Sequence, residues 1–131
     1  NRRTVRRPDE LVTAILVPMP ATDSRATFLK LGARAYLVIS IAMVAAVIEL
    51  GSDGRIASAR LVVGACSEVP MRVPAVEARL VGRTLAEAMD VTVDPADVAH
   101  LTPIDDVRAP ATYRREAALV LVRRAIAELA R

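Results

Sequence analysis

One side chain in this sequence is chemically unusual for its surroundings. Lys30 is the only lysine in a chain that has 18 lysine and arginine residues in total. Lysine carries a compact, strongly hydrated ammonium with rotatable donors, whereas arginine carries a planar fork. Two explanations are open on this evidence. Either substitution drift in an arginine-preferring background left one lysine, or position 30 has a task that an ammonium performs better than a guanidinium.

Cys66 and His100 are each the only residue of their type, and neither is accompanied by suitable partners. One cysteine cannot form an internal disulfide or a cysteine cluster for zinc or iron–sulfur. His100 has no cysteine or acid at metal-ligand spacing. We interpret Cys66 as a core or rim thiol rather than a nucleophile, and His100 as a loop or helix-end residue rather than a general base. The sequence therefore predicts no catalytic residue and no metal ligand.

Two adjacent carboxylates, Asp105 and Asp106, precede a predicted helix. Neighbouring residues point in different directions, so we expect helix capping or a salt bridge to Arg108 or Arg114 rather than acid–base chemistry. Tyr113 lies near the start of the same helix. We predict that it anchors the helix to a sheet rather than contacts a ligand.

The elements that must position these residues begin as strands. Alternation, β-branched residues and turn formers predict strands over residues 9–18, 28–32, 39–50 and 55–66. A hairpin turn is expected at 51–54, where Asp53-Gly54 is the strongest signal. Both alternating sets of side chains in 39–50 are apolar. We therefore expect both faces of that strand to be covered, the second by helices of this domain or by a partner.

Helix signals follow Pro70. Helices are expected over residues 73–82, 84–87, 94–101 and 111–129. A proline near the start and a glycine at the end mark the first, and Thr84 with Glu87 forms a capping box for the second. The last helix has an apolar stripe that would pack on the sheet, made of Ala118, Leu121, Val122, Ala125 and Leu129. Strands followed by helices predict an α+β fold, a small antiparallel β-sheet packed against about three α-helices.

Composition narrows the class of protein. The 131 residues suit a single domain, and with 53% hydrophobic but only 2% aromatic residues the core must consist of Val, Leu, Ile and Ala. The longest uncharged run, 35–48, is shorter than the about 20 residues that span a bilayer, and no signal peptide is visible. We expect a cytoplasmic protein without a membrane partner, and the single cysteine agrees with a reducing compartment.

The net charge of +3 includes two clusters of arginine that would allow contact with nucleic acid. An arginine-rich surface paired with the 15 acidic residues is the alternative that we favour. Because no aromatic stacking platform accompanies the arginines, single-strand binding is disfavoured and we expect no nucleic-acid partner. The two clusters are Arg2, Arg3, Arg6 and Arg7, and Arg114, Arg115, Arg123 and Arg124.

Several stretches occur together in a characteristic order: ELVTAILVP, FLKLGAR, the Asp-Gly hairpin, ARLVVGACSEVPMRVPAVEARLVG and PIDDVRAPATYRREAALVLVRRAI. From Arg7 onward the chain resembles the C-terminal domain of the FAD-binding (medium) subunit of molybdenum hydroxylases. That family includes carbon monoxide dehydrogenase and xanthine dehydrogenase. The most specific motifs are Phe-x-Lys-x-x-x-Arg (28–34) and Asp-x-Arg-x-x-x-x-Tyr-Arg (106–114).

The resemblance implies a function within an oxidoreductase subunit. Such a domain closes over an FAD held mainly by a preceding domain, and the flavin transfers electrons between iron–sulfur clusters and a terminal acceptor. Iron–sulfur and molybdopterin would be on partner subunits, and this chain alone would not be catalytic. The resemblance places Lys30 and Val12 at the flavin. An ammonium there is physically reasonable, because a flavin ring gains negative charge on reduction.

The sequence also departs from the family. An acid that is often eight residues after the lysine is missing, and Val38-Ile39-Ser40 occupy that stretch. The glycine-rich loops that bind the diphosphate are absent, so we expect them in a domain that precedes Asn1. Residues 1–18 would be the tail end of that FAD-binding domain and residues 19–131 the C-terminal-like domain. This chain alone should bind FAD weakly or not at all. The alternative function is a stand-alone interaction module that binds nucleic acid through the arginine clusters.

Overall fold

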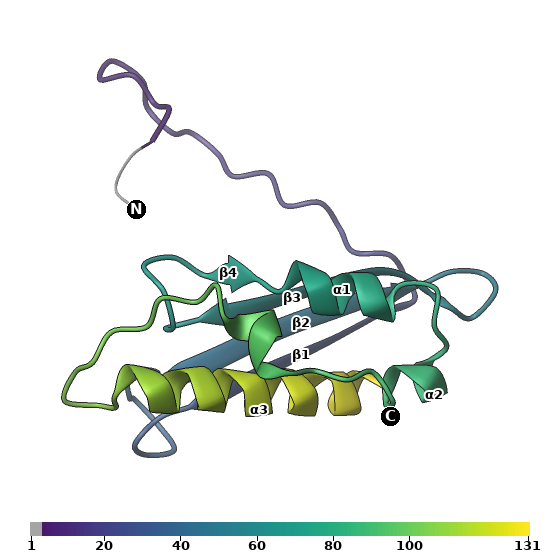
Figure 1. The fold of residues 1–131 in the computed structure, drawn as a ribbon. Coiled ribbons are helices and arrows are strands. Elements are labelled where there is room, and N and C mark those ends of the chain that lie inside the picture. The colour runs from purple at the N-terminus through teal and green to yellow at the C-terminus, as the bar shows by residue number, and fades with distance from the viewer. Residues whose placement is uncertain (1–3) are drawn as a thin grey trace.

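The computed structural model describes residues 4–131, and an antiparallel sheet of four strands forms its centre (Figure 1). The strands are β1 (Ser24–Leu31), β2 (Ala42–Leu50), β3 (Ile56–Gly64) and β4 (Met71–Arg72). They lie in the order β1-β2-β3-β4, so every strand pairs with its neighbour in sequence. Three of the four predicted strands are therefore present, although β1 begins earlier than expected and β2 later.

The hairpin between β2 and β3 forms where it was predicted. Gly54 has a φ of 74°, a left-handed conformation that costs glycine little. The side chain of Asp53 accepts a hydrogen bond from the backbone N–H of Arg55 over 3.0 Å. This turn sets the register in which Val44 pairs with Val63 and Ala46 with Leu61.

The helical elements all lie on one face of the sheet (Figure 1). They are α1 (Pro74–Leu80), α2 (Leu85–Ala88), the 3₁₀ helix η1 (Pro95–Val98) and α3 (Ala111–Leu129). All four predicted helical segments are present, and only the segment at 94–101 is a 3₁₀ turn instead of an α-helix. The predicted α+β class is confirmed.

The capping box at the start of α2 provides a local test of the fold. Thr84 Oγ1 accepts from the backbone N–H of Glu87 over 3.3 Å, and Glu87 Oε2 accepts from the backbone N–H of Thr84 over 2.8 Å. Thr84→Ala should lower the free energy of unfolding by about 1 kcal/mol, because a backbone donor loses its partner. Urea unfolding should show a lower midpoint with an unchanged slope. An equal loss in the exposed-threonine control Thr92→Ala would contradict the assignment.

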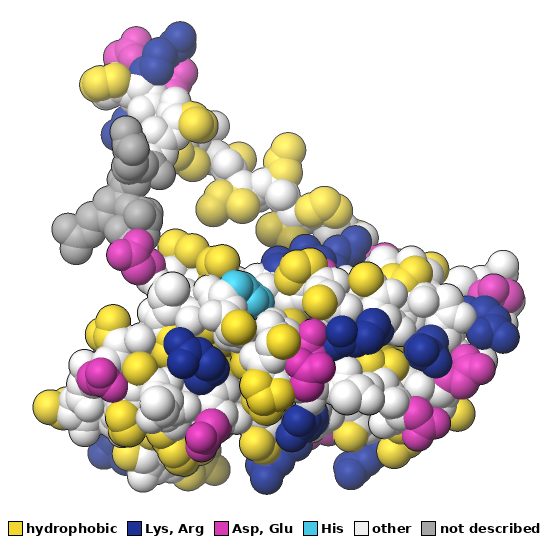
Figure 2. Space-filling view, viewed as in Figure 1, with side chains coloured by type: hydrophobic (Ala, Val, Ile, Leu, Met, Phe, Trp, Pro, Cys, Tyr) yellow, Lys and Arg dark blue, Asp and Glu magenta, His cyan; other side chains and the backbone are white. Residues whose placement is uncertain are grey.

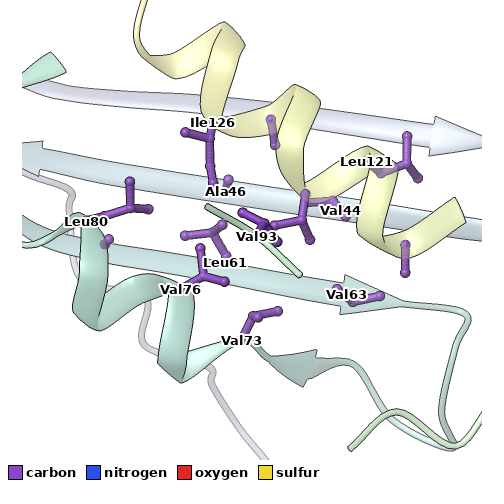
Figure 3. Packing of buried hydrophobic residues seen from close by; sticks show 14 of the residues in the cluster. Val44, Ala46, Leu61, Val63, Val73, Val76, Leu80, Val93, Leu121 and Ile126 are labelled. Atoms are coloured by element: carbon purple, nitrogen blue, oxygen red, sulfur yellow. The ribbon is translucent and has the colours of Figure 1, made fainter. Parts of the chain in front are cut away.

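The core lies between the sheet and the helices (Figure 3). Leu121 and Ile126 of α3 and Val76 of α1 point at the same apolar face of β2 and β3. The stripe predicted for the last helix is buried in full, which confirms its packing on the sheet. Fully buried residues include Val44, Ala46, Leu61, Val63, Val73, Val76 and Val122.

The opposite face of the sheet has no helix over it among residues 4–131. Side chains that point to this side from β2 are Met43, Ala45 and Val47, which are half-buried or exposed. On β1, Phe28 is 60% exposed. The sequence left two possible covers for this second face, helices of this domain or a partner. No helix among the described residues covers it, so a partner is the remaining alternative. We call this surface the open face.

The N-terminal segment 4–23 corrects one prediction. No strand forms over residues 9–18, which leave the body of the domain as an extended arm (Figure 1). A strand requires a neighbour for its N–H and C=O groups, and none of the described residues supplies one. The arm holds an exposed apolar series, Leu11, Val12, Ile15, Leu16, Val17 and Met19. Within the described part of the chain, no helix has the length and hydropathy needed to cross a membrane.

Candidate functional site

Lys30 lies on the open face, near the end of β1. It is exposed, and it pairs in register with Met43 of β2. Its Nζ donates a hydrogen bond to the carbonyl of Val38 over 2.7 Å. Because an ammonium has three donors, this contact positions the charge and leaves donors for a ligand. The structure therefore gives the lone lysine a defined local partner that the sequence alone did not indicate.

The loop between β1 and β2 is held by the two basic residues of the first motif. Arg34 Nη2 donates to the carbonyl of Leu37 over 2.6 Å, while Lys30 holds the next carbonyl. Leu37 has a φ of 49°, a left-handed conformation that is uncommon for a leucine. Gly32 permits the close return of the chain, because a Cβ at this position would overlap Val38. The loop is thus tied down at its tip and at its base.

The second motif places Arg114 at the centre of a buried network. The Arg114 side chain is 2% exposed and forms an ion pair of 2.6 Å with Asp106. Its other donors reach the carbonyls of Ile41 (2.8 Å), Ala65 (3.2 Å) and Ala109 (3.4 Å). One guanidinium therefore joins the start of α3 to the beginning of β2, the end of β3 and the loop before the helix.

The carboxylates before α3 are structural, as predicted. Asp105 Oδ1 accepts from the backbone N–H of Ala111 over 2.6 Å and so caps the helix. Asp106 accepts from Arg108 Nε over 2.9 Å as well as from Arg114. Burial alone would raise the pKa of Asp106, but hydrogen bonds from Arg108 and Arg114 outweigh it and hold the pKa well below its usual range. A carboxyl that stays ionised is unsuited to general acid catalysis near neutral pH.

Tyr113, Cys66 and His100 have no arrangement with the other described residues suited to catalysis or metal binding. Tyr113 is 46% exposed, so the prediction that it anchors the helix is wrong, and the next residue, Arg114, makes that connection. Cys66 is buried, and burial raises the pKa of its thiol, which confirms a core thiol. His100 is an exposed residue between elements, with Nε2 2.9 Å from the carbonyl of Arg72. No cluster suited to a metal ion occurs among the side chains that the structure describes.

Among the arginines that the structure describes, the two clusters form no continuous basic face. In the C-terminal cluster Arg114 is buried, Arg115 donates to the carbonyl of Leu101 (3.2 Å), and Arg123 donates to the carbonyl of Val93 (2.9 Å). Figure 2 shows basic and acidic side chains interspersed over the face that it presents. These arginines hold the last helix against its neighbours.

In the N-terminal cluster, Arg2 and Arg3 lie outside the described residues. Arg7 forms an ion pair of 2.9 Å with Glu10 on the same arm. Arg6 donates to the backbone carbonyls of Arg7 and Glu10. Both described arginines of this cluster are therefore engaged in contacts within the arm.

The two motifs meet in space, which the sequence did not reveal. Arg34 of the first and Arg108 of the second line the same hollow at the loop end of the sheet. The sequence held one hint of this proximity, because each motif carries an arginine next to a segment predicted to be a loop. The other predicted site residue, Val12, is 65% exposed on the extended arm (Figure 1), and the structure does not bring it to Lys30.

These features define an α+β domain with one bare sheet face and two motif loops fastened at one end. The profile of the CO dehydrogenase flavoprotein C-terminal domain family matches residues 27–129, and the chain belongs to this family. No curated protein sequence matches the chain significantly.

Three solved structures share the fold. CO dehydrogenase from Oligotropha carboxidovorans superposes with a TM-score of 0.72 at 28% identity, over 87% of this chain and 39% of that one. Carbon monoxide dehydrogenase from Hydrogenophaga pseudoflava (TM-score 0.71, 24% identity) matches 86% of this chain and 39% of its own. Quinoline 2-oxidoreductase from Pseudomonas putida 86 superposes with a TM-score of 0.70 at 23% identity, over 87% of this chain and 39% of that one. The last two support the fold alone, and the chain spans about two-fifths of each matched protein.

Proposed function

We propose that this chain acts as the C-terminal domain of the FAD-binding subunit of a molybdenum-containing oxidoreductase of the CO dehydrogenase or xanthine dehydrogenase type. The observation that carries the proposal is the Lys30 ammonium, held by the Val38 carbonyl beside the apolar side chains of Phe28 and Met43 on the open face. Membership of the flavoprotein family supports it. In this function the open face closes one side of a flavin pocket that a preceding domain builds, in a cytoplasmic complex.

The residues on the open face fit the ring of a flavin better than its phosphates. Phe28 pairs in register with Ala45, and Ala45 pairs with Val62, so a row of apolar side chains crosses the sheet beside Lys30. Such a row offers contact to a flat aromatic system, and the ammonium favours the negative charge that a flavin ring acquires on reduction. When bound, FAD supplies the electron transfer, while this chain supplies a wall and one cation.

The rest of the cofactor needs groups from elsewhere. The five glycines of the sequence are scattered, and no glycine-rich phosphate cradle is present in the chain. We assign the diphosphate to the preceding domain, and we assign iron–sulfur and molybdopterin to partner subunits. Val12 would reach the flavin only where its arm pairs with that preceding domain. Bound in this way, FAD would supply electron transfer between the iron–sulfur clusters and a terminal acceptor.

The proposal predicts that flavin binding requires more than these 131 residues. The chain alone and the chain extended N-terminally by the region encoded upstream should be purified in the presence of FAD and passed through gel filtration. The extended protein should retain flavin absorbance, whereas the 131-residue chain should lose it. If neither protein retains flavin, or if the shorter one retains it equally well, the proposal that a preceding domain and this chain together bind FAD is refuted.

A further inference from the structure

The loop end of the domain carries a groove that flavin closure does not explain. Two hollows of about 440 Å³ each share Ile39 and Arg108 as a common wall. The first is lined mainly by aliphatic side chains, with the Arg34 and Arg108 side chains among them. The second continues towards Ser67, Thr102 and Ile104. We call the pair the loop-end groove.

The rim of this groove exposes apolar side chains from two separate loops. Leu37 and Ile39 come from the loop between β1 and β2, and Leu37 is 93% exposed. Ile104, also exposed, comes from the loop that precedes α3. Scattered single apolar residues are normal on a surface, whereas a concentration around a hollow marks an interaction site.

The same rim keeps a net positive charge. Arg34 and Arg108 line the first hollow, and Lys30 is bound to one of its lining residues, Val38. Arg108 is already paired with Asp106, which also holds Arg114, and Asp105 caps α3. Among the described residues, Arg34 is therefore the arginine of the first hollow that has no acidic partner, its Nη2 donating instead to the Leu37 carbonyl. Glu68 lines the second hollow only. An anionic group is therefore favoured at the first hollow.

The loop that bears this rim is organised before any partner arrives. A leucine in the left-handed region is strained and persists where surrounding contacts impose it. Here the contacts are the hydrogen bonds from Arg34 to the Leu37 carbonyl and from Lys30 to the Val38 carbonyl. Such preorganisation reduces the entropy that binding must overcome. A strained, exposed leucine thus points to binding rather than to stability.

We propose that the loop-end groove binds an extended acidic–apolar segment of a partner protein. An aliphatic or aromatic side chain of that segment enters the first hollow, and a flanking carboxylate pairs with Arg34. Nucleic acid is a poorer fit because the lining is aliphatic, and a membrane is a poorer fit because the apolar rim surrounds hollows instead of a continuous plane. The inference does not require the chain to bind flavin.

Amide chemical shifts of the ¹⁵N-labelled 131-residue chain provide the test. The probe is an acetylated, amidated seven-residue peptide of alternating aspartate and leucine. We expect shifts confined to residues 33–41 and 104–108, and weaker binding by about tenfold in Arg34→Gln, because a charge-assisted hydrogen bond contributes about 1.5 kcal/mol or more. Arg124→Gln removes an exposed arginine elsewhere on the surface and should bind like the parent chain.

Two further titrations separate the alternatives. A peptide with asparagine in place of aspartate should bind much more weakly, and equal binding would overturn the charge argument. Vesicles of mixed phosphatidylserine and phosphatidylcholine should leave the spectrum unchanged, and binding to them instead of the peptide would identify a membrane surface. The proposal also fails if the acidic peptide shifts no amide at millimolar concentration, or shifts residues outside the groove.

Discussion

Replacing Arg114 with leucine should lower the melting temperature of this domain by about 10–20 °C. The substitution removes the partner of Asp106 and the donor to the carbonyls of Ile41, Ala65 and Ala109, all of which Arg114 contacts. Breaking a buried, hydrogen-bonded ion pair costs about 3–5 kcal/mol, and for a domain of this size each kcal/mol corresponds to about 3–5 °C. Differential scanning calorimetry measures the change directly.

Matched variants show whether the buried network is the cause. Arg124→Leu removes an exposed arginine from the same helix and should change the melting temperature by little. Arg114→Lys retains the charge but offers fewer and differently placed donors, so an intermediate loss is expected. Equal effects of Arg114→Leu and Arg124→Leu would mean that the contacts of Arg114 contribute nothing beyond the loss of a charge.

Local signals explain why much of the fold could be predicted from the sequence. Asp53-Gly54 and the Thr84 capping box each specify a backbone conformation within a few residues, and both appear in the structure. The apolar stripe of the last helix has a period that only one face of an α-helix can bury. The family followed from motif order along the chain, and the profile match over 27–129 confirms it.

Interactions between distant segments explain what could not be predicted. Arg114 meets carbonyls at positions 41 and 65, and nothing in the spacing indicated that it, rather than Tyr113, would enter the core. The arm over 9–18 has strand-like composition, yet a strand depends on a neighbour that sequence composition does not specify. The hollow shared by Arg34 and Arg108 likewise exists only once the two loops are folded together.

The second large effect concerns Lys30 in the complete flavin-containing subunit, and it rests on the proposed function. Lys30→Met should lower the flavin reduction potential by about 30 to 60 mV. The reduced ring carries more negative charge than the oxidised ring, so loss of a nearby ammonium destabilises the reduced form and makes reduction harder. A charge-assisted hydrogen bond of about 1.5–3 kcal/mol gives that range for a two-electron couple. Potentiometric titration followed by flavin absorbance measures the shift.

Three companion variants separate the charge of Lys30 from its contact with the loop. Arg60→Met removes another cation from the open face, one paired with Glu49 at 3.3 Å, and should leave the potential unchanged. Lys30→Arg keeps the charge but changes the donor geometry, so both flavin affinity and potential should shift, by less than in Lys30→Met. Arg34→Gln loosens the same loop while the ammonium stays. If Arg34→Gln alone reproduces the shift, Lys30 acts by shaping the loop, and if neither Lys30 variant changes affinity or potential, the ammonium does not face the flavin.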